Sequence, residues 1–292
     1  MGSTAFAAAK VNLYLHVIGR RADGYHLLDS LIAFADVGDR LTAESAGVLS
    51  LEVSGPEAAS LPSADEDNLV LRAARLLAAH AGIATGAALR LQKSLPVAAG
   101  IGGGSSDAAA VLRALRQLWR VSIGDAALCA LAARLGADIP ACVGGYTVWV
   151  GGIGERVEPA AALPKAGILL ANPRTKLPTA AVFAARRGPF GYPGRFEPMP
   201  ADVVGLAQTL MLCCNDLTDA AISLVPEIGA VLARLGALPG ALLARMSGSG
   251  ATCFALFRDR DAAERAREAL AAAEPRWWCA AGGFVAAEEL SR

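Results

Sequence analysis

A glycine-rich segment with the sequence PVAAGIGGGSSDAAA offers the clearest chemistry in this chain. It separates an expected strand that ends at Pro96 from an amphipathic helical stretch that runs to about residue 119. Four of its residues can turn without Cβ clashes and let backbone amides approach an anion: Gly100, Gly102, Gly103 and Gly104. The helix that follows adds free N–H groups and a positive dipole end. The segment therefore predicts a cradle for phosphate.

Two named phosphate-binding patterns do not fit this segment. The Walker pattern requires a lysine directly after its last glycine, but Gly104 is followed by Ser105 and Ser106. The dinucleotide pattern G-x-G-x-x-G, counted from Gly100, requires glycine at position 105. We expect the two serines to cap the helix, with Asp107 in its first turn. The alternative is a flexible glycine linker.

One carboxylate and one ammonium are candidates for proton transfer. Asp138 has apolar neighbours in GADIPACVGG, so we expect it to be partly desolvated and to have a cationic partner. Lys10 is the candidate partner because lysine is rare in this chain and this one lies on the polar face of a strand. Beside a phosphate cradle, such a pair could transfer a phosphoryl group to an alcohol. Spacing alone leaves open that Asp138 ends a helix and that Lys10 faces solvent.

Three histidines and a second glycine cluster give weaker signals. His26 follows Tyr25 after a turn signal, and this aromatic pair could recognise a heterocycle. His16 continues the polar face of the first strand, and His80 belongs to an alanine-rich helix where a structural role is expected. The segment MSGSGAT at 246–252 is either a tight turn or a loop that closes a binding site from a second lobe.

Hydrophobic periodicity predicts the elements that position these residues. Alternation from Lys10 to His16 indicates a half-buried strand, and apolar residues at helical spacing indicate a helix over 69–81. Two helical stretches divided at Pro226 follow a Pro/Gly/Arg-rich connector at 186–200. The other expected strands cover 28–44, 48–55, 88–96, 167–173, 241–246 and 251–257, and the other expected helices cover 124–136 and 260–273.

Composition excludes several classes of protein. The 292 residues carry 27 basic and 27 acidic side chains, which argues against a nucleic-acid or membrane-surface protein. Apolar runs stop near a dozen residues, short of the roughly 20 that span a bilayer, and no signal peptide is recognised. Six cysteines without a CxxC motif indicate buried thiols in a reducing cytoplasm. A redox role for Cys213 and Cys214 is the alternative.

Three motifs in order carry a family resemblance: AKVNLYLHVIGRRADGYHLLDSL, LPVAAGIGGGSSDAA and MSGSGATCF, with GADIP and NDL at the expected intervals. With them the chain resembles the GHMP small-molecule kinases over nearly its whole length. The resemblance implies an α+β fold with two lobes. Residues 1–158 would form an ATP-binding and catalytic lobe like ribosomal protein S5 domain 2. Residues 159–292 would form a ferredoxin-like lobe that completes the substrate site.

The same resemblance implies an activity and its partners. The RRADGYH continuation points to ATP-dependent phosphorylation of the 2-hydroxyl of a cytidyl-diphospho sugar alcohol in non-mevalonate isoprenoid synthesis. Mg²⁺ is expected with ATP, although the resemblance supplies no protein ligand for it. A cytoplasmic monomer or weak homodimer without nucleic-acid or membrane partners is expected. The alternatives are another GHMP kinase with a different alcohol, and a non-catalytic nucleotide-binding sensor.

Roles for single residues also follow from the resemblance. Asp138 would be the base and Lys10 its partner. The acceptor substrate would be bound by Asn12, Tyr25, His26, Phe183 and Thr179, with cytosine between the rings of Tyr25 and Phe183. ATP would be bound by Pro96, Ala99, Gly100, Gly102, Gly103, Gly104, Ser105, Ser106, Asn68 and Lys93, with the last two at the adenine pocket.

Overall fold

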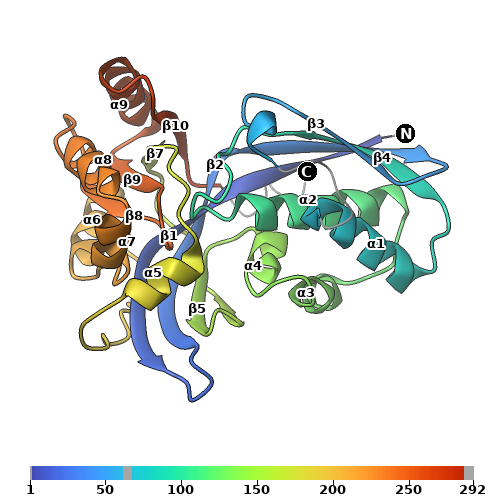
Figure 1. Ribbon diagram of the computed structural model, residues 1–292, viewed down its shortest axis with the longest axis horizontal. Coiled ribbons are helices and arrows are strands. Elements are labelled where there is room, and N and C mark those ends of the chain that lie inside the picture. Colours follow the sequence, from blue (N-terminus) through green and yellow to red (C-terminus); the bar gives the residue numbers. More distant parts are fainter. Residues whose placement is uncertain (1, 62–67, 286–292) are drawn as a thin grey trace.

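A computed structural model describes residues 2–61 and 68–285 and contains two β-sheets that pack together, with helices on their outer sides (Figure 1). The first sheet has the order β3-β4-β2-β5-β6, and β1 pairs with β2. Its strands are β1 (Gly2–Arg20), β2 (His26–Ala46), β3 (Ser50–Ser54), β4 (Gly86–Gln92), β5 (Val148–Gly152) and β6 (Arg156–Pro159). The second sheet has the order β10-β7-β9-β8. Its strands are β7 (Gly167–Asn172), β8 (Leu243–Met246), β9 (Cys253–Phe257) and β10 (Trp278–Gly283).

A long hairpin of β1 and β2 runs through both halves of the molecule (dark blue in Figure 1). Alternate residues of β2 face opposite sides of the sheet. Ile32 and Phe34 pack in the core of the first half, whereas Leu31 and Ala33 pack against residues of the second sheet. The prediction of a half-buried first strand was therefore wrong, because both faces of the hairpin are covered and even Lys10 is buried.

The first sheet is covered on one face by α1 (Leu69–Ala81), α2 (Gly103–Leu118), α3 (Asp125–Ala133) and α4 (Ile139–Gly144), and a short 3-10 turn spans Ala58–Ser60. The prediction of a helix over 69–81 is confirmed. Asn68 caps its start by accepting a hydrogen bond from the Val70 N–H. Gly82 ends it in the left-handed conformation.

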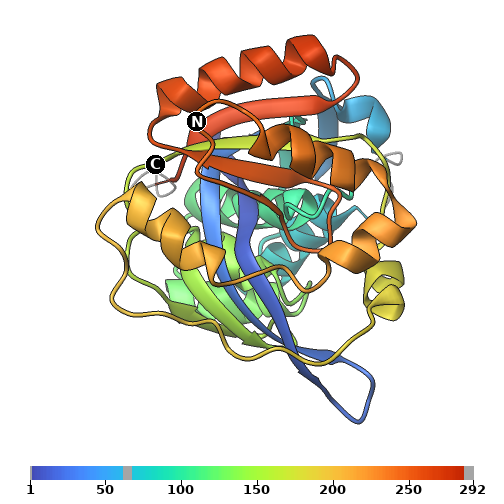
Figure 2. The same cartoon turned by 90° about the vertical axis from the view of Figure 1, so that its left-hand side faces the viewer.

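The second sheet follows the β-α-β-β-α-β order of a ferredoxin-like fold (Figure 2). Its connections carry α5 (Thr179–Ala185), α6 (Val203–Met211), α7 (Thr218–Leu224), α8 (Glu227–Gly236) and α9 (Arg260–Ala273). The predicted α+β class with a ferredoxin-like second lobe is confirmed. The predicted division of the chain at residue 158 stays a prediction, and it falls within β6.

Several local predictions differ from the structure. The region before Pro226 contains two helices, α6 and α7, where one was predicted, and β10 was not predicted because WCAAGG has no alternation of apolar and polar residues. The phosphate-loop helix α2 begins at Gly103, so Ser105 and Ser106 lie inside it and do not cap it. The hydroxyl of Ser106 instead donates to the Ala8 carbonyl on β1.

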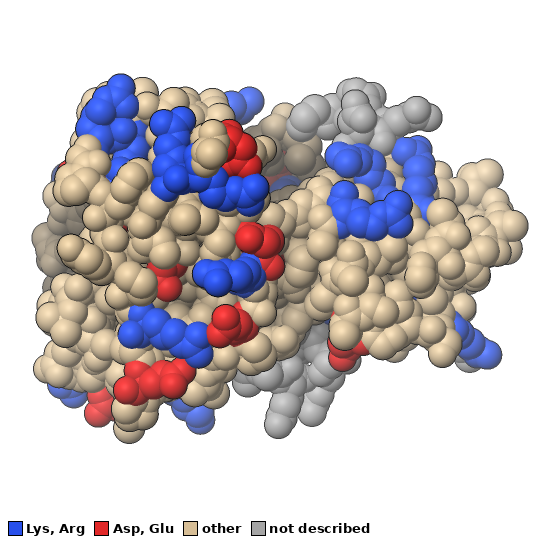
Figure 3. Space-filling view, turned by 90° about the horizontal axis from the view of Figure 1, so that it is seen from below, with Lys and Arg blue, Asp and Glu red and all other residues tan. Residues whose placement is uncertain are grey.

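Charged side chains of both signs lie interspersed on the half of the molecule that contains the second sheet (left in Figure 3). This distribution agrees with the equal numbers of basic and acidic residues. In the part of the chain that the structure describes, each helix is too short or too polar to cross a bilayer.

Candidate active site

The glycine-rich loop folds into a tight turn ahead of α2. Ala98, Gly100 and Gly102 have positive φ angles of 54°, 73° and 65°. A Cβ on Gly100 would lie 2.4 Å from the Gly250 carbonyl oxygen. A Cβ on Gly102 would lie 3.0 Å from the Lys10 side chain. Glycine is thus required at both positions by backbone angle and by close approach.

The second glycine cluster closes on this loop from the other sheet. The Thr252 N–H donates to the Ala99 carbonyl over 3.1 Å, and the Ser247 hydroxyl donates to the Gly100 carbonyl over 3.2 Å. The buried amide of Asn215 holds the cluster by donating to the carbonyls of Met246 and Gly248, both at 2.8 Å. Of the two readings of MSGSGAT, the structure favours the loop that closes a site.

Lys10 and Asp138 meet beside the glycine loop. The Lys10 Nζ lies 3.2 Å from Asp138 Oδ2, and the Lys10 N–H donates to the Ile101 carbonyl over 2.9 Å. The Lys10 side chain is 7% exposed, whereas that of Asp138 is 50% exposed. Asp138 is therefore less desolvated than expected, and it precedes a helix, α4, where the alternative placed it at a helix end. Its carboxylate can be reached from solvent.

A buried arginine fixes the helix that Asp138 begins. Arg113 on α2 donates to the Cys142 carbonyl at the end of α4 and to the Phe6 carbonyl on β1, both over 2.7 Å. Burial lowers the pKa of Arg113 to about 10, so the guanidinium remains charged at neutral pH. These contacts tie α4 to α2 and β1, which sets the position of Asp138 relative to Lys10.

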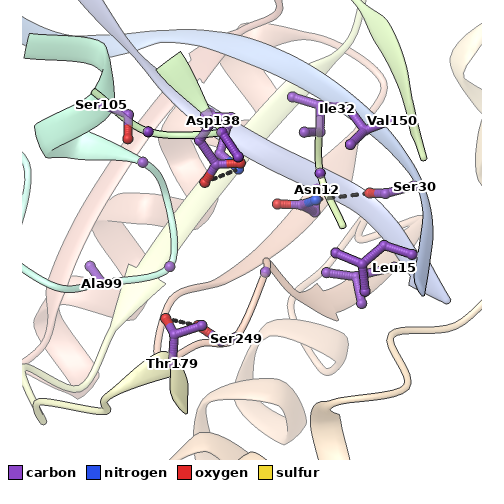
Figure 4. Close-up of a pocket in the computed structure, with 18 of the residues that line it drawn as sticks. Asn12, Leu15, Ser30, Ile32, Ala99, Ser105, Asp138, Val150, Thr179 and Ser249 are labelled. Carbon is purple, nitrogen blue, oxygen red and sulfur yellow. Dashed lines mark hydrogen bonds and ion pairs between the residues drawn. The ribbon is translucent and has the colours of Figure 1, made fainter. Parts of the chain in front are cut away.

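The loop, the ion pair and the second glycine cluster line one cavity of about 590 Å³, a volume typical of small-molecule sites. Figure 4 shows Asp138 and Asn12 on the β1 side of the cavity, with Thr179 and Ser249 across from them. The predicted residues in its lining are Lys10, Asn12, Ala99, Gly100, Gly102, Gly103, Gly104, Ser105, Asp138, Thr179 and Phe183.

Two hydrogen-bonded polar pairs line the cavity. Asn12 Nδ2 donates to the Ser30 hydroxyl over 2.8 Å, while Asn12 Oδ1 is buried without a hydrogen-bond partner. An unpartnered buried acceptor is costly, so it favours a ligand that donates a hydrogen bond there. Thr179 and Ser249 share a hydrogen bond of 2.8 Å between their hydroxyls.

Of the three residues predicted to bind cytosine, Phe183 lines the cavity, whereas Tyr25 and His26 do not. The ring of Phe183 stacks on His26, with centroids 5.1 Å apart and an interplanar angle of 25°. Burial, together with the charges of Arg20 and Arg186, lowers the pKa of His26, so its imidazole is neutral at pH 7. Tyr25, which precedes His26 in the sequence, is 61% exposed. Phe183 thus stacks on His26 in this structure, and the placement of cytosine between Tyr25 and Phe183 stays a prediction.

Comparison with known proteins decides the family. Models of the GHMP kinases N terminal domain and the GHMP kinases C terminal region match residues 68–146 and 202–276. The chain is 52% identical to the 4-diphosphocytidyl-2-C-methyl-D-erythritol kinase of Paramagnetospirillum magneticum, over 94% of this chain and 95% of that protein. It is 53% identical to the kinase of the same name from Cereibacter sphaeroides, over 96% and 99%. The chain belongs to the 4-diphosphocytidyl-2-C-methyl-D-erythritol kinases.

Solved structures agree with this membership. A crystal structure of a 4-(cytidine 5'-diphospho)-2C-methyl-D-erythritol kinase is 37% identical, with a TM-score of 0.79, over 97% of this chain and 99% of that one. The homoserine kinase of Cytophaga hutchinsonii is 18% identical, with a TM-score of 0.67, over 97% and 94%. The second likeness extends to the fold alone. Within this family, the chain is an ATP-dependent phosphotransferase.

Four residues predicted for the nucleotide do not line the cavity. Pro96 and Ser106 are buried, and the Ser106 hydroxyl is bound to Ala8. Asn68 is next to the lining residue Leu69, but its side-chain oxygen caps α1. Lys93 is 2% exposed and pairs with two buried carboxylates, so its ammonium cannot reach an adenine base. That Asn68 and Lys93 border an adenine pocket stays a prediction, to which the Lys93 ammonium does not contribute.

Sequence reasoning missed other residues that build the site. Ser30 and Ser249 line the cavity. Ser30 has no local signal, whereas Ser249 lies in the second glycine cluster but was not itself predicted to bind a ligand. Asn215 lies in the NDL segment, but its hydrogen bonds to the carbonyls of Met246 and Gly248 join residues more than 30 positions apart, which the sequence does not reveal. Arg113 had no signal, because it acts on carbonyls that are 29 and 107 positions away.

Proposed function

We propose that this chain transfers the γ-phosphoryl group of ATP to the 2-hydroxyl of 4-diphosphocytidyl-2-C-methyl-D-erythritol. The observation that carries the proposal is the Lys10–Asp138 pair, 3.2 Å apart beside an anion-binding turn in one cavity. The membership of the chain in a family of kinases of this name supports the acceptor. Homoserine and mevalonate kinases share only the fold with this chain, at 18% identity.

The glycine loop would bind the ATP phosphates. Its first helical hydrogen bond runs from the Ser106 N–H to the Gly102 carbonyl, so the N–H groups of Gly103, Gly104 and Ser105 precede that bond and stay free for an anion. The positive end of α2 adds to the attraction. A polyphosphate bound there would place its terminal phosphorus near Lys10 and Asp138.

The ion pair would handle the proton and the developing charge. The acceptor hydroxyl oxygen forms a bond to the γ-phosphorus, its proton passes to the Asp138 carboxylate, and ADP leaves with the electrons of the broken bond. Lys10 holds Asp138 in place and stabilises negative charge on the transferring group. Because the attacked hydroxyl is tertiary, positioning contributes more than nucleophile strength.

The remaining polar groups would orient the acceptor. Asn12 Oδ1, which is buried and unpartnered, would accept a hydrogen bond from a hydroxyl of the methylerythritol. Thr179 would donate to the same ligand from the opposite wall. Tyr25, His26 and Phe183 would bind cytosine, which requires the Phe183 ring to move off His26 or the base to stack on the outer face of one ring.

Mg²⁺ fits this site as a cation that arrives with ATP. Asp138 is the one carboxylate among the described residues that line the cavity, and it is already paired with Lys10. Residues 2–61 and 68–285 contain no group of three or more His, Cys, Asp or Glu that could hold a metal. The ion would therefore be held mainly by phosphate oxygens and water, with the Ser105 hydroxyl available as a protein ligand. It would neutralise phosphate charge.

A coupled ADP-release assay tests this function. The purified chain with Mg²⁺-ATP should release ADP with the cytidyl substrate and not with mevalonate, homoserine or galactose. Turnover of one of those alcohols at a similar kcat/KM would replace the assigned acceptor. ATP binding without ADP release for any of the four would favour the sensor alternative. A Lys10→Met variant should lose turnover in the same assay.

A further inference from the structure

A buried cluster of three charged side chains lies directly beneath the phosphate loop. The Lys93 Nζ lies 2.5 Å from Asp39 Oδ2 and 2.7 Å from Asp107 Oδ2. The three side chains are 2%, 0% and 4% exposed. They come from different elements, since Asp39 lies on β2, Lys93 follows β4 and Asp107 lies on α2. The cluster does not line the cavity, so the chemistry proposed above leaves it without a role.

The cluster ties together the two ends of the phosphate loop. Asp39 Oδ1 accepts hydrogen bonds from the backbone N–H groups of Ser94 and Leu95, which begin the loop. Asp107 is the fifth residue of α2, the helix that ends the loop. The single ammonium of Lys93 bonds both carboxylates and thereby joins these ends. It also supports the start of α2 from below, because a Cβ on Gly103 would lie 3.2 Å from Nζ.

The charges of the cluster do not cancel. Two carboxylates share one ammonium, and Asp107 Oδ1 is buried without a partner. Burial raises the pKa of Asp107 to about 7, and the nearby Asp39 charge adds to the rise although Lys93 opposes it. Burial lowers the pKa of Lys93, but the two carboxylates outweigh this effect and raise it overall. Both Asp107 and Lys93 therefore release their protons at a higher pH than the free side chains do.

We propose that Asp107 is a positioning residue for ATP, because its bond to Lys93 holds the start of α2 where the free N–H groups of the loop meet the phosphates. This proposal rests on the function proposed above. The bond needs an acceptor oxygen at this position but not a negative charge. An amide in place of the carboxylate would keep the bond and remove the buried excess charge, whereas a methyl group would cut the connection to α2.

The variants Asp107→Ala and Asp107→Asn separate these effects. Asp107→Ala leaves a neutral Asp39–Lys93 pair, and we expect it to raise KM for ATP about tenfold while KM for the cytidyl substrate changes by less than about twofold. Asp107→Asn should restore the ATP KM to within about threefold of the wild-type value. The control Asp125→Ala, which removes an exposed ion pair with Arg116 at the start of α3, should leave both constants unchanged.

Four results would overturn the proposal. A purely structural role predicts a lower Tm for Asp107→Ala with unchanged KM for ATP, or a parallel rise in both KM values. Equal kinetics of the Ala and Asn variants would also refute it. If Asp107→Ala does not fold, Asp107→Val fills more of the volume and should show the same selective rise. Failure of both to fold while Asp107→Asn folds would assign the residue to stability alone.

Calorimetric titration with Mg²⁺-ATP keeps the two proposals distinguishable. If the wild-type chain phosphorylates none of the alcohols, the proposed function fails, but the same variants still report on ATP affinity. A dissociation constant for ATP about tenfold higher in Asp107→Ala than in Asp107→Asn would support the positioning role without any turnover. Equal constants would remove it.

Discussion

The two ends of the cavity are built in different ways. At the phosphate end, the first glycine loop is tied beneath by the Asp39–Lys93–Asp107 cluster and covered by the second glycine cluster, which is bonded to Ala99 and Gly100. At the outer end, where we propose that cytosine binds, Tyr25 is 61% exposed and the Phe183 ring stacks on His26.

This difference follows from what each end must recognise. A phosphate group accepts hydrogen bonds from backbone N–H groups. The direction of these groups is set by the backbone, so the loop that carries them must be held rigidly. A cytosine ring is met by side-chain faces, which can turn and adapt. We therefore expect the phosphate end to serve ATP and the outer end to select the acceptor.

The largest expected effect is on the chemistry between the two ends. Asp138→Asn should lower kcat by about 10²- to 10⁴-fold, because the amide cannot take the hydroxyl proton. The ATP-induced rise in Tm should be preserved, since the loop is untouched. Steady-state kinetics and thermal unfolding with ATP check this pair of outcomes. Wild-type turnover in the variant would remove Asp138 from the mechanism.

A change at the rigid phosphate end should be next in size. Gly100→Ala forces a Cβ to within 2.4 Å of the Gly250 carbonyl at a φ of 73°, which we expect to cost about 1–3 kcal/mol and to lower kcat/KM for ATP about 10- to 100-fold. Gly124→Ala is the matched control, because its Cβ would meet nothing within 4 Å. Kinetics and Tm of both variants decide the outcome. Equal behaviour of the two would show that the loop is more adaptable than its contacts imply.

A change at the adaptable cytosine end should be smaller and selective. Phe183→Ala and Tyr25→Ala should each raise KM for the cytidyl substrate about tenfold, the loss expected when an aromatic face is removed from a base. KM for ATP should stay within about twofold, because neither ring belongs to the glycine loops that we propose bind the phosphates. Tyr192→Ala, which removes an aromatic ring that is 86% exposed, serves as the control. A rise in the ATP KM would mean that the two ends are coupled.

The smallest expected effect is a pH dependence of the free energy of unfolding, which arises from Asp107 at the phosphate end. The folded-state pKa of Asp107, about 7, lies above its unfolded value, so the folded chain binds more protons between roughly pH 4 and pH 7. This contribution is complete below that window and is lost as the pH rises through 7. Relative to Asp107→Asn, the wild-type free energy of unfolding should fall by about 1–2 kcal/mol from pH 5 to pH 8. Denaturant unfolding at several pH values measures it, and a constant difference between the two proteins would contradict it.

Local features were predictable because their causes are local. Helix 69–81 follows from apolar spacing, and its end follows from a glycine that alone tolerates the left-handed conformation. The phosphate loop follows from residues that must adopt positive φ ahead of a helix. The start of α2 was predicted three to four residues too late, because the N-cap is Gly102 and not Ser105 or Ser106, and the Ser106 hydroxyl donates to the Ala8 carbonyl on β1.

The sequence therefore predicted the family, the glycine-rich phosphate cradle, and a lysine and an aspartate as the reactive residues of the site. Only the folded arrangement brought Lys10 within 3.2 Å of Asp138, and it alone buried Lys93 between two carboxylates instead of exposing it to a base. The reason is that backbone angle and amphipathic spacing act over a few residues. A contact across 128 positions depends on strand order, on the path of the β1–β2 hairpin and on the packing of α4 against α2.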